Sequence, residues 1–290
     1  MIVAVASGKG GTGKTTVAVS LALSLLPSRP TFVDCDVEEP NAALFLRPDL
    51  DERQAVRLMV PEVDGKLCTH CGRCAEVCQY NAIAALPDKT LVFAEMCHGC
   101  GSCTLNCPAA AIREVPQTIG TIERGWAGQL EFAQGTMDIG QALPVPIIRQ
   151  LKHWMSTDRM GHTCRPIILD APPGTACPVV ATMSGADAVL LVTEPTPFGL
   201  HDLRLAVEVA RGELHLPVAV VVNRSAAPGH QTGYLGVDEY CAAEDVPILM
   251  YIPLDRRIAE AYSEGISLVE SVPEYRPRFR ALWQELGALQ

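Results

Sequence analysis

Eight cysteines between positions 68 and 107 fall into two runs with the same spacing, C-x₂-C-x₂-C-x₃-C. Three thiolates this close together can bind three corners of one iron–sulfur cube. The fourth cannot fold back onto the same cube, so it binds the other one. The spacing therefore predicts two 4Fe–4S clusters. The ligands of the first are Cys68, Cys71, Cys74 and Cys107, and those of the second are Cys78, Cys97, Cys100 and Cys103.

The two runs resemble those of bacterial two-cluster ferredoxins. Pro108 follows the second run as in that pattern, whereas Gln79 replaces the proline expected after the first. A zinc site is the alternative, but zinc favours two separated C-x₂-C pairs that close one tetrahedron. Disulfides are disfavoured because the chain has no N-terminal export signal, and dense cysteines in a reducing compartment indicate metal binding.

A second stretch with chemical potential is Gly8–Thr15, which fits G-x-x-x-x-G-K-S/T without a mismatch. An apolar run, Ile2–Ala6, precedes it and a helical pattern, Thr16–Leu26, follows, which is the context of a phosphate-binding loop. Backbone N–H groups and the helix dipole favour phosphate there. We expect Lys14 to reach the β- and γ-phosphates and Thr15 to bind Mg²⁺. The expected nucleotide-binding residues of the loop are Gly8, Gly10, Gly11, Thr12, Gly13, Lys14, Thr15 and Thr16.

Lys9 is an extra lysine inside this loop, and the sequence G-K-G-G-T-G-K-T-T resembles the deviant P-loop of the MinD/ParA/Mrp family, which includes the nitrogenase iron protein. The resemblance implies an ATPase that forms a homodimer, or a heterodimer with a related ATPase, around ATP. It also implies that Lys9 acts on the nucleotide of the partner subunit, as an arginine finger does.

Acidic residues end two short apolar segments, Asp34 and Asp36 after the first and Asp170 after the second. Ligands of open α/β sheets gather at the carboxyl ends of the strands. The family resemblance implies that Asp36 orients the attacking water or holds the Mg²⁺ shell, with Asp34 in support. It further implies that Asp170 holds a Mg²⁺-bound water and that the Gly174 N–H senses the γ-phosphate.

The resemblance also assigns Asn223 and Arg224 to the adenine end of the nucleotide, with Pro253 and Asp255 in a loop beside the base. Cys177 follows Asp170 at the offset at which the nitrogenase iron protein has a cysteine that binds a cluster shared across the dimer. A packing cysteine at the start of a helix is the alternative for this residue.

The phosphate-binding loop and the acids at the strand ends require a doubly wound, mainly parallel α/β sheet of the P-loop NTPase (SIMIBI) type. A small inserted α+β domain, similar to ferredoxins, interrupts it. We expect the ATPase domain at residues 1–60 and 116–290 and the insertion at 61–115. Alternation over 119–137 predicts a hairpin that re-enters the main sheet. Strands are expected at 31–34, 165–170, 188–193, 218–222 and 248–252, and helices at 144–155, 203–211 and 278–286, the last docked on the core.

Composition limits the possible partners. The 290 residues, 48% hydrophobic, suffice for one large core. The net charge of −10 disfavours nucleic-acid binding. The chain has no apolar run long enough to span a membrane, and its tail has few basic residues, so we expect a cytoplasmic protein without stable membrane association.

Three classes of function remain. The first is an ATPase, slow without a partner, whose nucleotide state controls the assembly or delivery of metal clusters to an acceptor. The second is an ATP-gated electron donor to a redox partner. The third is a spatial organiser similar to MinD or ParA, which leaves the cysteines unexplained.

Overall fold

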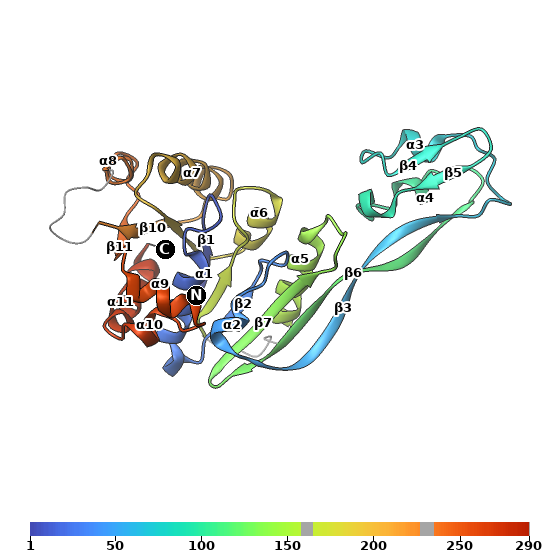
Figure 1. The fold of residues 1–290 in the computed structure, drawn as a ribbon. Helices are drawn as coiled ribbons and strands as arrows, with labels where there is room; N and C mark the ends of the chain where they lie inside the picture. Colours follow the sequence, from blue (N-terminus) through green and yellow to red (C-terminus); the bar gives the residue numbers. More distant parts are fainter. Residues whose placement is uncertain (158–164, 227–234, 290) are drawn as a thin grey trace.

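A computed structural model describes residues 1–157, 165–226 and 235–289 of the chain. In this part of the protein, one nine-stranded sheet has the order β11-β10-β9-β1-β8-β2-β7-β6-β3 (Figure 1). The strands from β11 to β7 in this order are parallel, whereas β6 is antiparallel to both β7 and β3. Their bounds are β1 Ile2–Ala6, β2 Thr31–Asp34, β3 Asp49–Val63, β6 Ile112–Ala127, β7 Leu130–Met137, β8 Ile167–Asp170, β9 Ala188–Thr193, β10 Val218–Ser225 and β11 Ile248–Pro253.

Helices cover both faces of the parallel strands, which explains why these strands are almost wholly apolar. One core lies beneath α1, α10 and α11, and the other beneath α5, α6, α7 and α8. The doubly wound α/β fold predicted from the sequence is therefore confirmed. The helices are α1 Lys14–Ser24, α2 Ala43–Leu46, α5 Pro144–Thr157, α6 Cys177–Met183, α7 Pro197–Val207, α8 Gly236–Ala243, α9 Arg256–Ser263, α10 Leu268–Ser271 and α11 Tyr275–Ala288, with a π-helix over Glu208–Glu213.

The C-terminal helix α11 is docked on the core, as predicted, through a buried apolar side. Its arginines reach the end of α1: Arg276 donates to the Leu23 carbonyl at 2.8 Å, and Arg280 donates to the Ser24 carbonyl at 2.9 Å. Positive groups stabilise the carbonyl end of a helix. Among the described residues, no helix is long and apolar enough to cross a bilayer.

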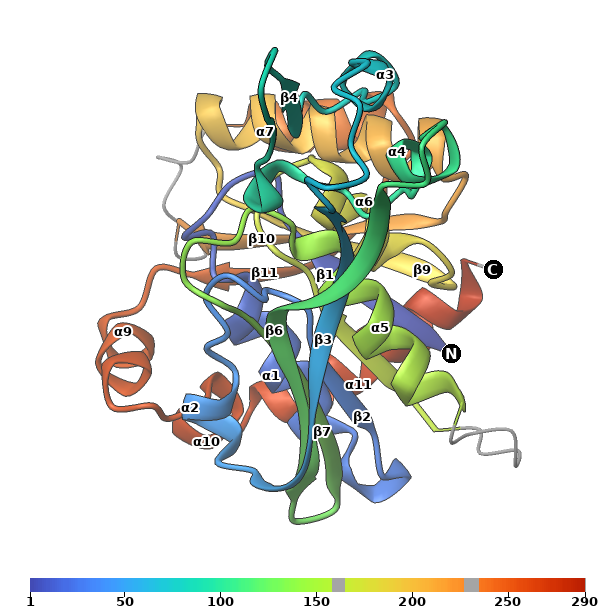
Figure 2. The same ribbon diagram turned by 90° about the vertical axis from the view of Figure 1, so that its right-hand side faces the viewer.

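The predicted hairpin is present as β6 and β7, which pair from Gly120 to Ala127 of β6. The outer half of β6 pairs with β3 alone, up to Val63 opposite Ile112. These two strands therefore leave the sheet as a twisted ribbon, which we call the arm (Figures 1 and 2). Gly125 permits close packing at its base, because a Cβ there would lie 1.8 Å from the Asp49 carbonyl oxygen.

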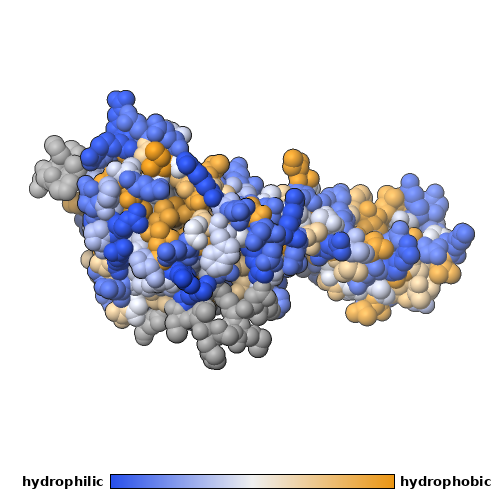
Figure 3. Space-filling model, turned by 90° about the horizontal axis from the view of Figure 1, so that it is seen from below, coloured by the Kyte–Doolittle hydropathy of each residue, from blue (hydrophilic) through white to orange (hydrophobic). Residues whose placement is uncertain are grey.

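The end of the arm carries the cysteine module, defined as residues 64–111. It contains α3 Arg73–Glu76, β4 Ile83–Ala85, β5 Thr90–Val92 and α4 Ser102–Leu105, with β4 and β5 antiparallel. In the space-filling view the module is a small lobe beyond the main body (Figure 3). Its own small cores include cysteines predicted to be ligands, since Cys74 packs with Ile83 and Cys97 packs with Ala82. The domain limits proposed from the sequence remain a prediction.

Candidate functional site: a phosphate-binding loop and two cysteine-lined cavities

The phosphate-binding loop joins the end of β1 to the first residue of α1, Lys14. Gly11 and Gly13 have φ values of 78° and 88°, in the left-handed region that favours glycine. Gly8 passes so close to α7 that a Cβ would lie 2.2 Å from the Asp202 carbonyl oxygen. The glycines therefore let the backbone turn tightly at the end of the central strand.

Lys14 and Asp170 form a buried ion pair beneath the loop. The Lys14 Nζ lies 2.6 Å from Asp170 Oδ1, and the two side chains are 7% and 0% exposed. Burial lowers the pKa of Lys14, but the Asp170 carboxylate, helped by Asp34 and Asp36, outweighs it and raises the pKa overall. Lys14 is therefore held charged at the end of β8, where it can bind phosphate.

Two oxygen atoms at this site, one from Asp170 and one from Thr15, fit a hydrated Mg²⁺. Within the described chain, Asp170 Oδ2 is buried and has no hydrogen-bond partner. The Thr15 hydroxyl lies 3.5 Å from the Lys14 Nζ, at the same edge of the sheet. Carboxylate and hydroxyl oxygens, with water, suit Mg²⁺. The assignment of Thr15, Asp36 and Asp170 to the metal stays a prediction.

Asp34 and Asp36 differ in surroundings. Asp34 is wholly buried and accepts hydrogen bonds from the backbone N–H groups of Asp36, Asn41 and Ala42 at 3.1–3.2 Å. Burial, and then the negative charge of Asp170, raises the pKa of Asp34 to about 7. Asp36 is half-buried, and burial raises its pKa to about 6. Asp34 thus shapes the loop, and Asp36 is the more accessible carboxylate.

Glu194, at the end of β9, was not predicted as a site residue. Its carboxylate lies 3.5 Å from the Lys9 Nζ and 2.5 Å from an Arg224 nitrogen. It therefore gathers two residues that the sequence assigned to the nucleotide site. The sequence could have indicated Glu194, because it follows a predicted parallel strand. The rule that ligands gather at the carboxyl ends of such strands also identified Asp34 and Asp170.

The base-binding candidates meet at the ends of β10 and β11. Asn223 donates through Nδ2 to the Thr12 carbonyl at 2.7 Å, so it holds the phosphate-binding loop. Pro253 pairs with the end of β10, and Asp255 caps α9 by accepting from the Arg257 N–H at 2.8 Å. Contacts of these residues with adenine stay a prediction.

Gly174 follows the end of β8 with a φ of 95°. Its N–H donates to the Ser7 carbonyl at 2.9 Å, so the segment after β8 is tied to the start of the phosphate-binding loop. This N–H must exchange that partner if it is to contact a γ-phosphate. Cys177 is the exposed first residue of α6 in the same segment.

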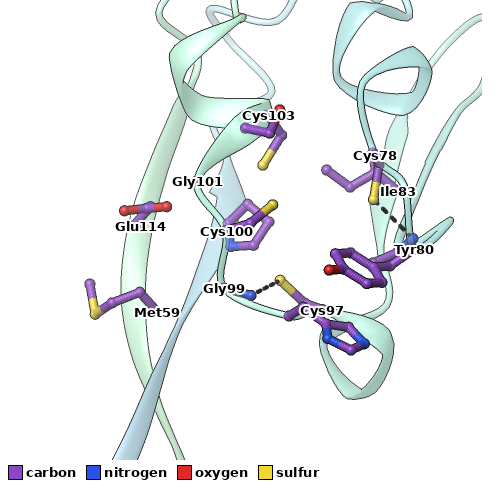
Figure 4. Close-up of a pocket in the computed structure, with 14 residues that line it drawn as sticks. Met59, Cys78, Tyr80, Ile83, Cys97, Gly99, Cys100, Gly101, Cys103 and Glu114 are labelled. Atoms are coloured by element: carbon purple, nitrogen blue, oxygen red, sulfur yellow. Dashed lines mark hydrogen bonds between the residues drawn. The ribbon is translucent and has the colours of Figure 1, made fainter. Parts of the chain in front are cut away.

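The cysteine module contains two cavities, each lined by four cysteines. The proximal cavity, nearer the sheet along β3, also contacts Met59 and Pro61, and the distal cavity contacts Val63. Figure 4 shows the sulfur atoms around the proximal cavity facing one shared space. The proximal set is Cys78, Cys97, Cys100 and Cys103, and the distal set is Cys68, Cys71, Cys74 and Cys107, which are the groupings predicted from the spacing.

Both cavities have the donors that cluster ligands require. All eight cysteines are free thiols. The Ala82 N–H donates to Cys78 Sγ and the Ala111 N–H to Cys107 Sγ, each at 3.3 Å. N–H donors to sulfur are the usual outer shell of an iron–sulfur cluster. In the described residues no group of three or more His, Cys, Asp or Glu side chains is arranged to bind one metal ion.

Comparison with known proteins agrees with the fold. Residues 3–269 match the CobQ/CobB/MinD/ParA nucleotide binding domain family. An uncharacterized protein of Methanocaldococcus jannaschii is 31% identical over 93% of this chain and 92% of its own length. An iron–sulfur cluster carrier protein of Pyrococcus horikoshii is 29% identical over 92% of this chain and 78% of its own. The structure of the septum site-determining protein MinD with Mg-ADP, from the same organism, superposes with a TM-score of 0.60 at 20% identity, covering 100% of this chain and 98% of that one.

Proposed function

Since the chain belongs to the CobQ/CobB/MinD/ParA nucleotide-binding family, we propose that it hydrolyses ATP and that its nucleotide state controls the assembly or delivery of iron–sulfur clusters. The observation that carries the proposal is the presence, on one chain, of a phosphate-binding loop and two four-cysteine cavities joined by continuous strands. The similarity to iron–sulfur cluster carrier proteins supports the same conclusion.

In the ATPase site, Lys14 binds the phosphates and Asp36 orients the attacking water. Thr15, Asp36 and Asp170 would hold Mg²⁺, which would neutralise charge that develops on the transferred phosphoryl group. Lys9 acts across a dimer interface, after it leaves Glu194 at 3.5 Å. The Lys9 side chain is 33% exposed, and leaving this 3.5 Å ion pair costs little, because ion pairs near the surface contribute about 0–1 kcal/mol.

The clusters are proposed to occupy the two cavities, with the ligand sets given above. Fully cysteine-ligated 4Fe–4S clusters supply one-electron chemistry or serve as the delivered group. The chain contributes the thiolates, the N–H donors to sulfur and the apolar walls of the cavities.

A physical connection links the two sites. Lys152 of α5 donates to three carbonyls at the end of α6, those of Ala181, Thr182 and Ser184, at 2.9, 2.7 and 2.7 Å. Helix α6 follows the segment after Asp170, so a change at the γ-phosphate reaches α5 through this contact. Ile147 of α5 packs on β6 and β7, the strands at the base of the arm.

An ATP-gated electron donor is the second candidate. One observation favours it: each cavity is lined by four cysteines of the chain itself. Of these eight cysteines, three are buried, namely Cys74, Cys97 and Cys103. A cluster with complete thiolate ligation is suited to stay in place and carry electrons.

The deciding experiment uses anaerobically purified protein with its clusters, a reductant and Mg-ATP. Hydrolysis-dependent movement of iron and sulfide to an apo acceptor supports the carrier. A nucleotide-dependent shift in cluster potential without transfer overturns delivery and supports the electron donor.

A further inference from the structure

The two cavities have different side chains around them, although each has a backbone donor at the fourth cysteine of a run. Ala82 and Ala111 each donate to the fourth cysteine of a run at the same 3.3 Å. These two contacts are alike, and the proximal cavity has one further backbone donor, the Gly99 N–H, which lies 3.4 Å from Cys97 Sγ (Figure 4). A difference in reduction potential must come from groups that act on one cavity only, which are the Gly99 N–H and the side chains that line each cavity.

Glu114 is such a side chain at the proximal cavity. It extends from β6 beside the loop of Cys100 and Gly101, and a Cβ at Gly101 would lie 2.9 Å from its Oε1 (Figure 4). A negative charge at this position disfavours reduction, because an added electron increases the negative charge of the site. Glu114 is exposed, so solvent screening keeps the effect moderate.

The distal cavity has two polar side chains at one ligand sulfur, against the one extra backbone N–H of the proximal cavity. The Thr90 hydroxyl lies 3.6 Å from Cys68 Sγ, and the His70 ring nitrogen Nδ1 lies 3.8 Å from the same sulfur. Hydrogen bonds to ligand sulfur withdraw electron density and raise the potential. Arg73 also lines this cavity, but its charge is paired with Glu76 at 3.1 Å.

We infer that the proximal cavity holds the cluster of lower reduction potential, with Glu114 lowering it, and that the distal cavity holds the cluster of higher potential, with the Thr90 hydroxyl raising it. This rests on the proposed function, which places a cluster in each cavity. One added electron then resides at the outer end of the module, and the site nearer the nucleotide is the stronger reductant.

The test is a potentiometric titration of the anaerobic holoprotein, followed by electron paramagnetic resonance. We expect two separate one-electron midpoints. Glu114→Gln should raise only the lower midpoint, by about tenfold in the reduction equilibrium, or about 59 mV for a one-electron couple. Thr90→Val should lower only the upper one. Glu62→Gln, on the paired strand and lining neither cavity, is the matched control and should not selectively move the lower midpoint.

Coincident midpoints, or a shift of the upper midpoint in Glu114→Gln, would overturn the inference. Iron content distinguishes this outcome from failure of the proposed function. About eight irons per chain with coincident midpoints defeats only the inference, whereas an iron content well below that value defeats the two-cluster proposal itself.

Discussion

Replacing Lys14 by methionine leaves Asp170 buried without its cation. The ion pair is 2.6 Å long, Asp170 is fully buried, and Asp34 and Asp36 add further negative charge nearby. Removing one partner of a buried pair typically costs about 3–5 kcal/mol, because the remaining charge stays desolvated. We therefore expect Lys14→Met to lose about that much unfolding free energy near neutral pH.

The assay is urea unfolding of the anaerobic holoprotein near neutral pH, followed by circular dichroism. The double variant Lys14→Met/Asp170→Asn removes both charges and should recover most of the lost stability. Lys66→Met, at an exposed lysine, is the control and should change stability by less than about 0.5 kcal/mol. The reasoning is refuted if Lys14→Met costs under about 1 kcal/mol, or if the double variant is no more stable than the single one. Both Lys14 variants should lose tight ATP binding.

Lys9→Ala should bind ATP normally yet lose about 10³-fold or more in phosphate release, the usual effect of an arginine finger; unchanged turnover would rule out its action across the dimer. Asp36→Ala should reduce single-turnover hydrolysis by about 10²–10³-fold, as loss of a positioning group does, and an active variant would assign the water to another residue. Because the pKa of Asp34 is raised to about 7 from 3.8, its contribution to stability is fully present below about pH 4 and lost as pH rises through 7. Asp34→Asn should flatten this part of the plot of unfolding free energy against pH, measured by denaturant titration. An unchanged plot would exclude Asp34 as the source. Lys152→Met should keep its ATP affinity but lose the effect of nucleotide on the cluster spectrum, a coupling of about 1–3 kcal/mol, and a retained effect would show that α5 and α6 do not transmit it.

The chemistry-bearing strands were predictable because buried parallel strands are short apolar runs with a polar residue at the end. The predicted bounds Thr31–Asp34 and Ala188–Thr193 are those observed. The spacing also groups the cysteines, three from one run with the fourth from the other, and their role as cluster ligands stays a prediction. Both cavities have the predicted members.

The arm was not predictable from local pattern. Strand β3 is charged and largely exposed, with Val56 and Val60 among its few buried residues, so neither alternation nor an apolar run marks it. It exists because it pairs with β6, a contact between residues far apart in the chain. The helix expected from Leu203 to Arg211 instead begins at Pro197, because proline is well accommodated in a first turn. From Glu208 it continues as a π-helix.

The central claim is that nucleotide at the phosphate-binding loop and clusters in the cysteine module influence each other. The most direct measurement is the iron content of anaerobically purified protein, together with its paramagnetic resonance spectrum with and without Mg-ATP. The account predicts about eight irons per chain and a spectrum or midpoint that changes with nucleotide. Fewer than about four irons per chain, or a spectrum that ignores Mg-ATP at saturating concentration, would contradict it.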